Sequence, residues 1–320
     1  MSEPLVSIIV PAFNAGRYIG QSITSLLQQS YTNLELIVIN DGSTDNTADV
    51  IQSFSDKRIR YFEQQNSGQC KASNAGLRQA AGELIRFFDA DDIMNREHIE
   101  LQVKKLNTRT DAVGSCEWGR FYNAIPESAR FEPEAVWKDM KSLDWLKTCL
   151  QDPAAMMGGW LWLIPRAIID KAGGWDERLG LNNDFEFSIR LLLKANEVLF
   201  TPGAKLYYRT GDQTLSVTKT KAAYEAAYLS TQLGCSYLLG AENSALMRRL
   251  CANRYQQWIY QLYPSYPDLC SKMEQEISKL GGSDAKVGGG IVLKSLTVFF
   301  GWKMAKRIQS FFYKLGYKTK

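Results

Sequence analysis

The chain has 320 residues, of which 45% are hydrophobic and 22% are charged. This is enough for one large α/β domain with an appendage and a sizeable buried core. The net charge of +4 is mild and does not indicate nucleic-acid binding by the whole chain, so no nucleic-acid partner is expected.

The first hundred residues alternate apolar runs with amphipathic segments, which predicts a parallel sheet covered by helices. Strands are expected over residues 6–10, 34–39, 58–62 and 83–88. Helices are expected over residues 16–29, 44–54 and 68–80, with Thr44 or Asp45 as a cap of the second. Ligands of such sheets collect at the carboxyl ends of the strands, where the turns at 11–14, 40–43 and 89–92 fall.

The remaining chain is less regular. Further strands are expected over residues 111–122, 160–164, 197–200 and 205–208, and helices over 96–106, 143–150 and 184–193. Residues 218–280 have a helical pattern, and glycines at 281–282 and 288–290 interrupt it. We therefore expect a main domain over 1–215, a helical extension over 216–283 and a basic amphipathic tail over 284–320.

The cysteines and the N-terminus bear on localisation. The six cysteines are far apart and form no Cys-x-x-Cys pair, which is typical of reduced, buried thiols in a cytosolic protein. The first residues lack the features of a signal peptide, and no uncharged run is long enough to span a bilayer. The catalytic part is therefore expected in the cytoplasm.

The tail leaves two interpretations open. No acidic residue follows Asp284, while lysines accumulate and apolar residues recur every three or four positions between residues 296 and 315. Such a helix can lie over residues 290–320 on an anionic membrane surface, with Trp302 at the boundary, which would make the protein peripheral on the inner face of the cytoplasmic membrane. It can equally pack on the main domain with solvated lysines.

Two acidic turns follow neighbouring predicted strands. Asp41 precedes Gly42, so its carboxylate can point into the crevice and accept a hydrogen bond from the ring nitrogen of uracil, although Asp-Gly is also a common turn former. Asp89, Asp91 and Asp92 crowd like charges together, which is costly unless a cation binds nearby. Oxygen ligands favour Mg²⁺ or Mn²⁺ completed by a diphosphate; the alternative is that these residues cap the following helix.

In this order, five segments resemble those of family 2 glycosyltransferases. The segments are VSIIVPAFN at 6–14, NDGSTD at 40–45, SNAG at 73–76, FDADD at 88–92, and GWDE at 174–177 followed by Asp184. As an ordered set they are highly specific, and the resemblance covers residues 4–210. It implies the GT-A fold, which has a Rossmann-like, mostly parallel central sheet flanked by helices, here with a C-terminal helical extension.

The resemblance also implies how a nucleotide-sugar donor is bound. Pro11, Ala12 and Asp41 would hold the nucleoside. Asp89 would face the sugar or ribose, and Asp91 would bind the metal on the diphosphate.

Asp184 matches the second residue of the family's Glu-Asp pair, which the resemblance implies is the catalytic base. An inverting transfer needs one base that takes the proton from the attacking acceptor hydroxyl. The alternative is that Asp184 only caps the following helix. Glu186 and Arg190 are expected to pair on the surface of that helix.

The chain departs from the family pattern at three places. The family's Glu-Asp pair is Asn183-Asp184 here. Ser73 stands where many relatives have arginine before Asn74. Asn74 and Lys71 are expected among the donor-binding residues, and Lys71 would compensate for the missing arginine beside the diphosphate.

The third departure concerns the metal. Many relatives place a histidine after a Tyr-Arg pair, whereas Thr210 follows that pair here. The single histidine, His98, is expected at the surface. Metal binding would then depend on Asp91, with Asp212 as a candidate second ligand, and on the nucleotide.

The sequence thus predicts metal-dependent, inverting transfer of a single sugar from a nucleotide-diphosphate sugar, with UDP as the expected nucleotide. The expected acceptor is a hydroxyl of a lipid-linked glycan in bacterial cell-surface polysaccharide assembly. The alternatives are a nucleotidyltransferase, which would carry a glycine-rich phosphate loop after the first strand, and a non-catalytic sugar-nucleotide-binding or scaffold protein. Trp160, Trp162 and Trp175 are expected in the core, although aromatic rings near a turn can also stack on a sugar.

Overall fold

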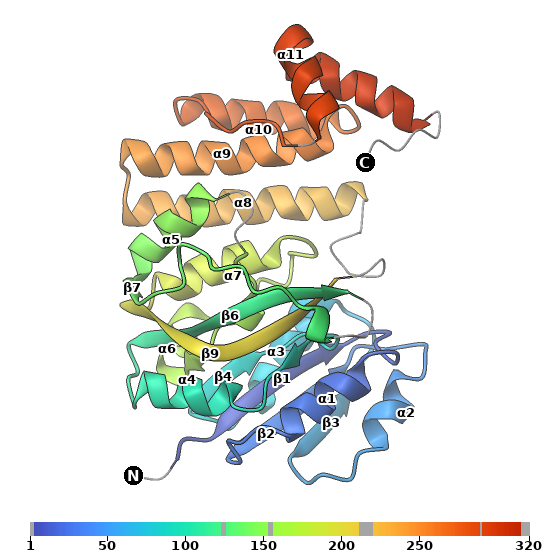
Figure 1. The fold of residues 1–320 in the computed structure, drawn as a ribbon, viewed down its shortest axis with the longest axis vertical. Coiled ribbons are helices and arrows are strands. Elements are labelled where there is room, and N and C mark those ends of the chain that lie inside the picture. The colour runs from blue at the N-terminus through green and yellow to red at the C-terminus, as the bar shows by residue number, and fades with distance from the viewer. Residues whose placement is uncertain (1–2, 123–125, 153–155, 211–219, 289, 315–320) are drawn as a thin grey trace.

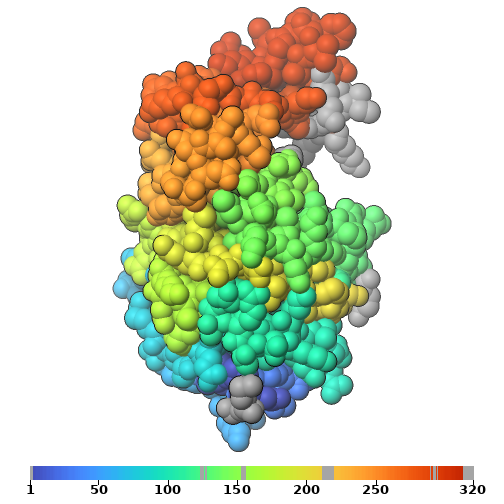
Figure 2. Space-filling view, turned by 90° about the vertical axis from the view of Figure 1, so that its left-hand side faces the viewer, coloured from blue at the N-terminus to red at the C-terminus, as the bar shows by residue number. Residues whose placement is uncertain are grey.

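The computed structural model describes residues 3–122, 126–152, 156–210, 220–288 and 290–314. The molecule is elongated, with the sheets and their covering helices at one end and a stack of helices at the other (Figure 1). Figure 2 shows the same column from the side, with the C-terminal helices at the end opposite the N-terminal half of the chain.

The main sheet has five strands in the order β3-β2-β1-β4-β8. The strands are β1 (Val6–Ala12), β2 (Leu34–Asn40), β3 (Ile59–Glu63), β4 (Leu84–Phe87) and β8 (Ile164–Pro165). The first four are parallel, and only β8 runs antiparallel. Every residue of β2 is buried, as expected of a parallel strand covered on both faces. The predicted parallel sheet is confirmed.

Helices cover this sheet where the sequence predicts them. They are α1 (Ile19–Leu27), α2 (Thr47–Gln52) and α3 (Gln69–Gln79). The predicted helix after the acidic turn is α4 (His98–Leu106), which packs mainly against a second sheet. Gly76 lets α3 approach the sheet, because a Cβ there would lie 2.4 Å from a methyl carbon of Ile9. Asp45 Oδ1 accepts the Thr47 N–H at 3.0 Å, so this side chain satisfies a free donor at the start of α2.

A second sheet crosses the C-terminal part of the domain. It contains β5 (Ile93–Met94), β9 (Glu197–Thr210), β6 (Ala112–Tyr122) and β7 (Met140–Lys141). The prediction of two short strands over 197–200 and 205–208 was wrong, because one strand continues through a register shift opposite Cys116 and Glu117.

The segment over 160–164 is likewise not a strand. Gly159–Leu161 form a 3₁₀ turn, η2, and β8 pairs for two residues before α6 (Arg166–Ala172) begins. Pro165 has no N–H to extend the pairing. The remaining short elements of the domain are η1 (Pro126–Ser128), α5 (Ser142–Gln151) and α7 (Asn183–Leu192).

The helical region consists of three helices stacked beyond the sheets (Figure 1). They are α8 (Lys221–Ala241), α9 (Ala245–Leu262) and α10 (Pro267–Lys279). Gly234 of α8 lies so close to α7 that a Cβ would be 2.5 Å from the Phe185 ring. Buried residues of α8, α9 and α10 belong to the same apolar core as the sheet strands, so these helices extend the main core.

The last helix, α11 (Ile291–Lys314), is kinked at Gly301, where φ is 73° and ψ is 157°. After the kink, the Trp302 ring packs edge-on against Tyr260 and Tyr263 of the α9 end, with centroids 5.0 and 5.4 Å away. Lys303 forms an ion pair with Glu274 at 2.8 Å. The packing interpretation therefore applies to this half of the tail, and Trp302 contacts protein.

Both halves of α11 also carry exposed apolar side chains, and beyond the kink Met304, Phe311 and Phe312 are 47%, 60% and 45% exposed. Val298, Phe299 and Phe300 are 81%, 79% and 62% exposed, and we call these three residues the apolar arm. Within the described part of the chain, no helix combines the length and apolarity needed to cross a membrane.

Two expectations about individual side chains have clear outcomes. All six cysteines are buried and free, as predicted. The prediction of a surface His98 was wrong, because α4 packs against β9 and buries the ring completely. Its Nδ1 lies 3.1 Å from the carbonyl oxygen of Lys205, and burial lowers the pKa of the imidazole well below its usual value.

Candidate active site

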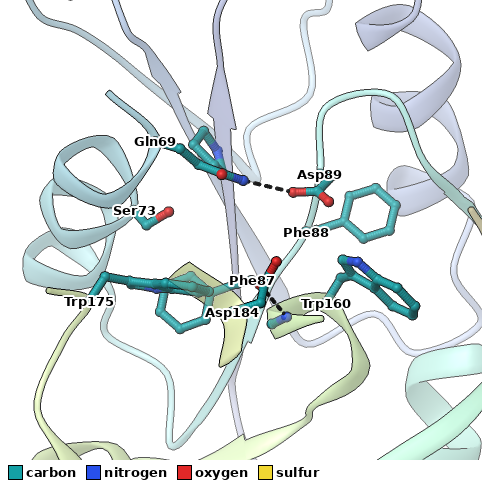
Figure 3. Close-up of a pocket in the computed structure, with 10 residues that line it drawn as sticks. Gln69, Ser73, Phe87, Phe88, Asp89, Trp160, Trp175 and Asp184 are labelled. Carbon is teal, nitrogen blue, oxygen red and sulfur yellow. Dashed lines mark hydrogen bonds between the residues drawn. The ribbon is translucent and has the colours of Figure 1, made fainter. Parts of the chain in front are cut away.

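A pocket opens at the carboxyl ends of β1 and β4, where the sequence predicts ligand binding, and its empty space, counted together with the part open to solvent, is about 220 Å³. Three sequence-predicted residues line it: Pro11, Asp89 and Asp184. The other lining residues are Gln69, Ser73, Phe87, Phe88, Gly159, Trp160 and Trp175. Figure 3 shows Asp184 between the rings of Trp175 and Trp160. The fold thus brings residues of β1, α3, the β4 end, η2 and α7 around one space.

Asp184 lies in the first turn of α7, and its carboxylate is held from another segment. Oδ1 accepts the Gly159 N–H at 2.7 Å (Figure 3). The N-cap residue of α7 is Asn182, so Asp184 is not the cap of this helix. Burial raises the pKa of Asp184 to about 6, while the bond from Gly159 opposes the rise. A carboxylate with this pKa is mostly ionised at neutral pH and is a stronger base than a free aspartate.

The acidic cluster combines burial with mutual repulsion. Asp89 Oδ1 accepts the side-chain amide of Gln69 at 3.2 Å. Asp92 is fully buried; its Oδ1 accepts the Arg209 N–H at 2.8 Å, and its Oδ2 has no hydrogen-bond partner among the described residues. Burial, and then the charges of neighbouring carboxylates, raise the pKa values of Asp89 and Asp92 well above normal. Burial also raises the pKa of Asp91. A bound cation would relieve this repulsion.

The carboxylate ligands present here fit a metal ion that is also bound by a diphosphate. Over the described ranges, no three His, Cys, Asp or Glu side chains are grouped so that they could hold a metal ion. Mg²⁺ is commonly held by one or two carboxylates together with substrate phosphates and water, and Asp91 can supply such a ligand. Asp212, the other candidate ligand, lies outside the described residues.

Arg209 is a cation beside this cluster whose role the sequence did not indicate. Its Nε donates to the main-chain oxygen of Asp91 at 2.6 Å. The guanidinium lies over the rings of Tyr18 and Phe121, 4.4 and 4.5 Å from their centroids. These contacts fix a positive charge next to the carboxylates. The signal in the sequence is the Tyr-Arg pair at the end of β9.

Asp41 lies at the end of β2 and is 3% exposed. Its Oδ1 accepts Gln64 Nε2 at 2.7 Å and the Ser67 N–H at 3.0 Å, and its Oδ2 accepts the Gly68 N–H at 2.8 Å. The carboxylate therefore organises the loop that leads into α3. Its role toward a nucleobase stays a prediction.

The other residues predicted to bind the nucleotide-sugar donor differ in their exposure and contacts. Ala12 is 1% exposed, so a nucleoside could reach little more than its backbone. Lys71 is exposed on α3 and is not among the residues that line the pocket. Asn74 binds the Gly-Trp-Asp-Glu turn: its Oδ1 accepts the Trp175 N–H at 2.8 Å, and its Nδ2 donates to Glu177 Oε1 at 3.0 Å. Their roles in donor binding stay predictions.

The turn before α7 is also held from the helix itself. Glu186 and Arg190 pair as predicted, at 2.6 Å, but Glu186 is 1% exposed, so this is not a surface pair. Arg190 also donates to the carbonyl oxygens of Gly173 and Gly174 at 3.2 and 2.8 Å. Trp175 stacks on Phe187 with centroids 3.9 Å apart. The pair therefore fixes the turn that carries Trp175.

The predicted burial of the tryptophans is confirmed, with Trp160, Trp162 and Trp175 at most 7% exposed. Trp160 and Trp175 nevertheless contribute to the pocket wall. Sequence reasoning missed Gly159, where a Cβ would lie 2.4 Å from the Trp175 ring. It also missed Phe13, a 47% exposed aromatic ring just beyond β1, within the motif at 6–14.

Comparisons with known proteins bear on the family of this chain. Residues 7–172 match the family described as Glycosyl transferase family 2. An uncharacterized glycosyltransferase of Haemophilus influenzae is 44% identical over 106 residues, 32% of this chain and 42% of that protein. One from Rickettsia typhi is 32% identical over 192 residues, 59% of each protein. Glycosyltransferase GlyG of Streptococcus pneumoniae serotype 4 is 36% identical over 134 residues, 41% of this chain and 43% of that protein. The matches cover less than two thirds of each of these relatives.

The fold is also found among solved structures. S. aureus TarS 1–349 in complex with UDP-GlcNAc aligns with a TM-score of 0.71, over 98% of this chain and 93% of that chain, at 19% sequence identity. The same fragment in complex with UDP gives a TM-score of 0.67. At this identity the likeness concerns the fold. The ordered motifs, the sheet and the family match together place the chain in glycosyl transferase family 2, with a GT-A fold extended by C-terminal helices.

Proposed function

We propose that the protein transfers a single sugar from a nucleotide-diphosphate sugar to a hydroxyl group of an acceptor, with inversion at the anomeric carbon. The observation that carries this proposal is that Asp184 and Asp89, which come from different elements, line the same pocket. UDP is the proposed nucleotide, since a protein of the same fold binds UDP-GlcNAc.

In this mechanism the acceptor oxygen attacks the anomeric carbon from the face opposite the diphosphate. Asp184 takes the hydroxyl proton as the new carbon–oxygen bond forms and the bond to the diphosphate oxygen breaks. The nucleoside diphosphate leaves with the bonding electrons. Attack opposite the leaving group inverts the anomeric configuration.

The leaving group carries growing negative charge, which has to be offset at the diphosphate. Mg²⁺ or Mn²⁺, held by Asp91 and the diphosphate, would supply that stabilisation. Arg209 adds a positive charge next to Asp91. Phe13 offers a flat apolar face to the nucleobase at the neighbouring strand end.

The proposed acceptor is a lipid-linked glycan of cell-surface polysaccharide assembly, reached from the inner face of the cytoplasmic membrane. The apolar arm of α11 supports peripheral binding, because three exposed apolar side chains lie in a segment with lysines and no acidic residue after Asp284. The charge of the segment suits anionic lipids.

A panel of nucleotide sugars, assayed with Mn²⁺ or Mg²⁺ for slow donor hydrolysis and for transfer, tests the proposal. Wild type is expected to consume one of the donors. NMR of the product is expected to show that the anomeric configuration is inverted relative to the donor. Binding of a nucleotide sugar without hydrolysis or transfer would instead favour the non-catalytic sugar-nucleotide-binding alternative.

A further inference from the structure

Arg86 is a fully buried arginine directly beneath the site. It lies in β4, three residues before Asp89, and its relative exposure is 0%. Its Nη1 donates to Gln102 Oε1 of α4, and its Nη2 donates to the main-chain oxygen of Trp160, both at 2.7 Å. Within the described ranges, no carboxylate lies within the 4.0 Å ion-pair distance of Arg86. A buried charge without an ion-pair partner is costly, so its hydrogen bonds have to compensate.

The Trp160 oxygen belongs to the turn that also holds Asp184. Gly159 and Trp160 are consecutive residues of η2. The N–H of Gly159 donates to Asp184 Oδ1, and the next residue's carbonyl accepts from Arg86. These groups lie in two different planar peptide units, 158–159 and 160–161. The hydrogen bond from the Leu161 N–H to the Gly158 oxygen, at 3.1 Å, ties the two units together, so a shift of the Trp160 carbonyl displaces the Gly159 N–H as well. The turn is thus held from β4 on one side and bonded to α7 on the other.

The turn has little room to adjust by itself. The Trp160 ring lines the pocket, and its centroid lies 5.3 Å from that of Tyr208. At Gly159 a Cβ would come within 2.4 Å of the Trp175 ring. The guanidinium has a planar fork that can bind Gln102 and Trp160 at the same time, which a lysine ammonium on a flexible stem reproduces poorly.

We propose that Arg86 is a positioning residue for sugar transfer: it holds η2 so that the Gly159 N–H meets Asp184 and the Trp160 ring closes the pocket wall. This inference rests on the proposed role of Asp184 as the base. Arg86 does not touch the substrate and acts only through the turn. A purely structural role would instead affect stability without changing the behaviour of Asp184.

The test compares Arg86→Lys with a matched arginine elsewhere. Arg166 also binds two main-chain oxygens, those of Gly82 and Ala80 at 2.7 and 2.8 Å, but it does not line the pocket. For Arg86→Lys we expect kcat to fall about tenfold or more, since small misplacements near the reacting groups cost up to about 100-fold, while the donor KM changes less than about twofold. Arg166→Lys is expected to leave kcat unchanged.

The pH profile gives a readout that a structural role would not move. A weaker Gly159 bond removes stabilisation of the charged carboxylate, so the acidic limb of kcat/KM for Arg86→Lys is expected at higher pH than in wild type. Unchanged kcat and an unchanged acidic limb in folded Arg86→Lys would overturn the inference. If Arg86→Lys does not fold, Gln102→Met, which removes the other partner of Arg86, is expected to show the same upward shift, and an unshifted limb there would count against the inference.

A second measurement separates this inference from the proposed function. The Asp184 carboxyl pKa can be followed by ¹³C NMR in the full chain, without substrate. A higher pKa in Arg86→Lys than in wild type supports the link through η2 even if no donor is turned over, in which case only the proposed function fails. Equal Asp184 pKa values in Arg86→Lys and wild type would refute the coupling through η2 even if wild type transfers sugar.

Discussion

Asn74 binds both backbone polar groups of Trp175, accepting its N–H at 2.8 Å and donating to its carbonyl oxygen at 2.9 Å. One amide side chain therefore ties α3, on the proposed donor side, to the turn that leads into α7. Trp175 lines the pocket, so this contact fixes part of the wall near Asp184.

Asn74→Ala is expected to lower the free energy of unfolding by about 1–3 kcal/mol, because it leaves the polar groups of a buried residue without partners. Denaturant unfolding measures this. Lys71→Ala on the same helix is the matched variant: an exposed lysine should change stability by less than about 0.5 kcal/mol. If Lys71 offsets the diphosphate charge, Lys71→Ala is expected to weaken the donor affinity measured by calorimetry. Asn74→Ala is expected to weaken this affinity less. The reverse pattern would contradict this division of roles.

Asp184→Asn is expected to bind donor but to lower transfer about 10²–10⁴-fold, the usual contribution of a general base. In wild type, activity should fall as the pH drops through about 6, since the base must be ionised and burial raises its pKa to about 6. The variant should lack this limb. Equal transfer by the variant would rule out Asp184 as the base.

The same substitution should stabilise the fold at neutral pH. The folded pKa of about 6 lies above the usual value of 3.8, so the native state binds more protons between these pH values and wild-type stability falls as pH rises through them. Asp184→Asn removes this penalty, and its Tm at pH 7 is expected above that of wild type. At pH 3 the difference should vanish, and a lower Tm at pH 7 would contradict the burial argument.

Asp91→Asn tests the metal. With UDP and Mn²⁺ at 100 times the dissociation constant, wild type should gain about 2.7 kcal/mol of unfolding free energy. The variant should gain much less, and EDTA should remove most of the wild-type gain. Asp170→Asn, which changes an exposed carboxylate on α6, is the control. An equal gain in Asp91→Asn and wild type would show that Asp91 does not hold the cation.

Asn183→Glu restores the family's acidic pair. Asn183 is 8% exposed, and its Nδ2 lies 3.3 Å from Gln69 Oε1 and 3.2 Å from Cys70 Sγ. A carboxylate there would add a buried negative charge beside Asp184, so the acidic limb of the activity profile should move to higher pH. Asn183→Ala, which adds no charge, should not move it upward. An unshifted limb in Asn183→Glu would mean that residue 183 is electrostatically separate from the base.

The double substitution Phe299→Ser with Phe300→Ser tests the apolar arm. Burial of each ring in a membrane is worth about 1.5–3 kcal/mol, so flotation with anionic vesicles should fall at least about tenfold. Salt should weaken wild-type binding by screening. Tyr122→Ser, which changes a 57% exposed ring on β6, is the control. Unchanged flotation of the double variant would refute a membrane contact of the apolar arm, and equal binding of wild type to neutral vesicles would refute an electrostatic contribution.

Local patterns predicted the first half of the fold well. The apolar run predicted as a strand over residues 34–39 is β2, because a strand covered on both faces must be apolar along its whole length. Prediction failed where pairing is set by distant segments. His98 gives no local sign of burial, and only the packing of α4 on β9 excludes it from solvent. The kink at Gly301 likewise divides α11 into two segments where one continuous helical face was expected.

By itself, the sequence determined the family and identified the carboxylates of the candidate site. Asp89 and Asp91 directly follow a buried strand, and Asp184 follows a characteristic turn. Tertiary structure alone decided how these groups are held. The bond from Gly159 to Asp184 spans 25 residues, and that from Arg86 to Trp160 spans 74. Such hydrogen bonds depend on how packed segments meet, which no local spacing encodes, and the burial that raises the pKa of Asp184 exists only once those segments have closed around it.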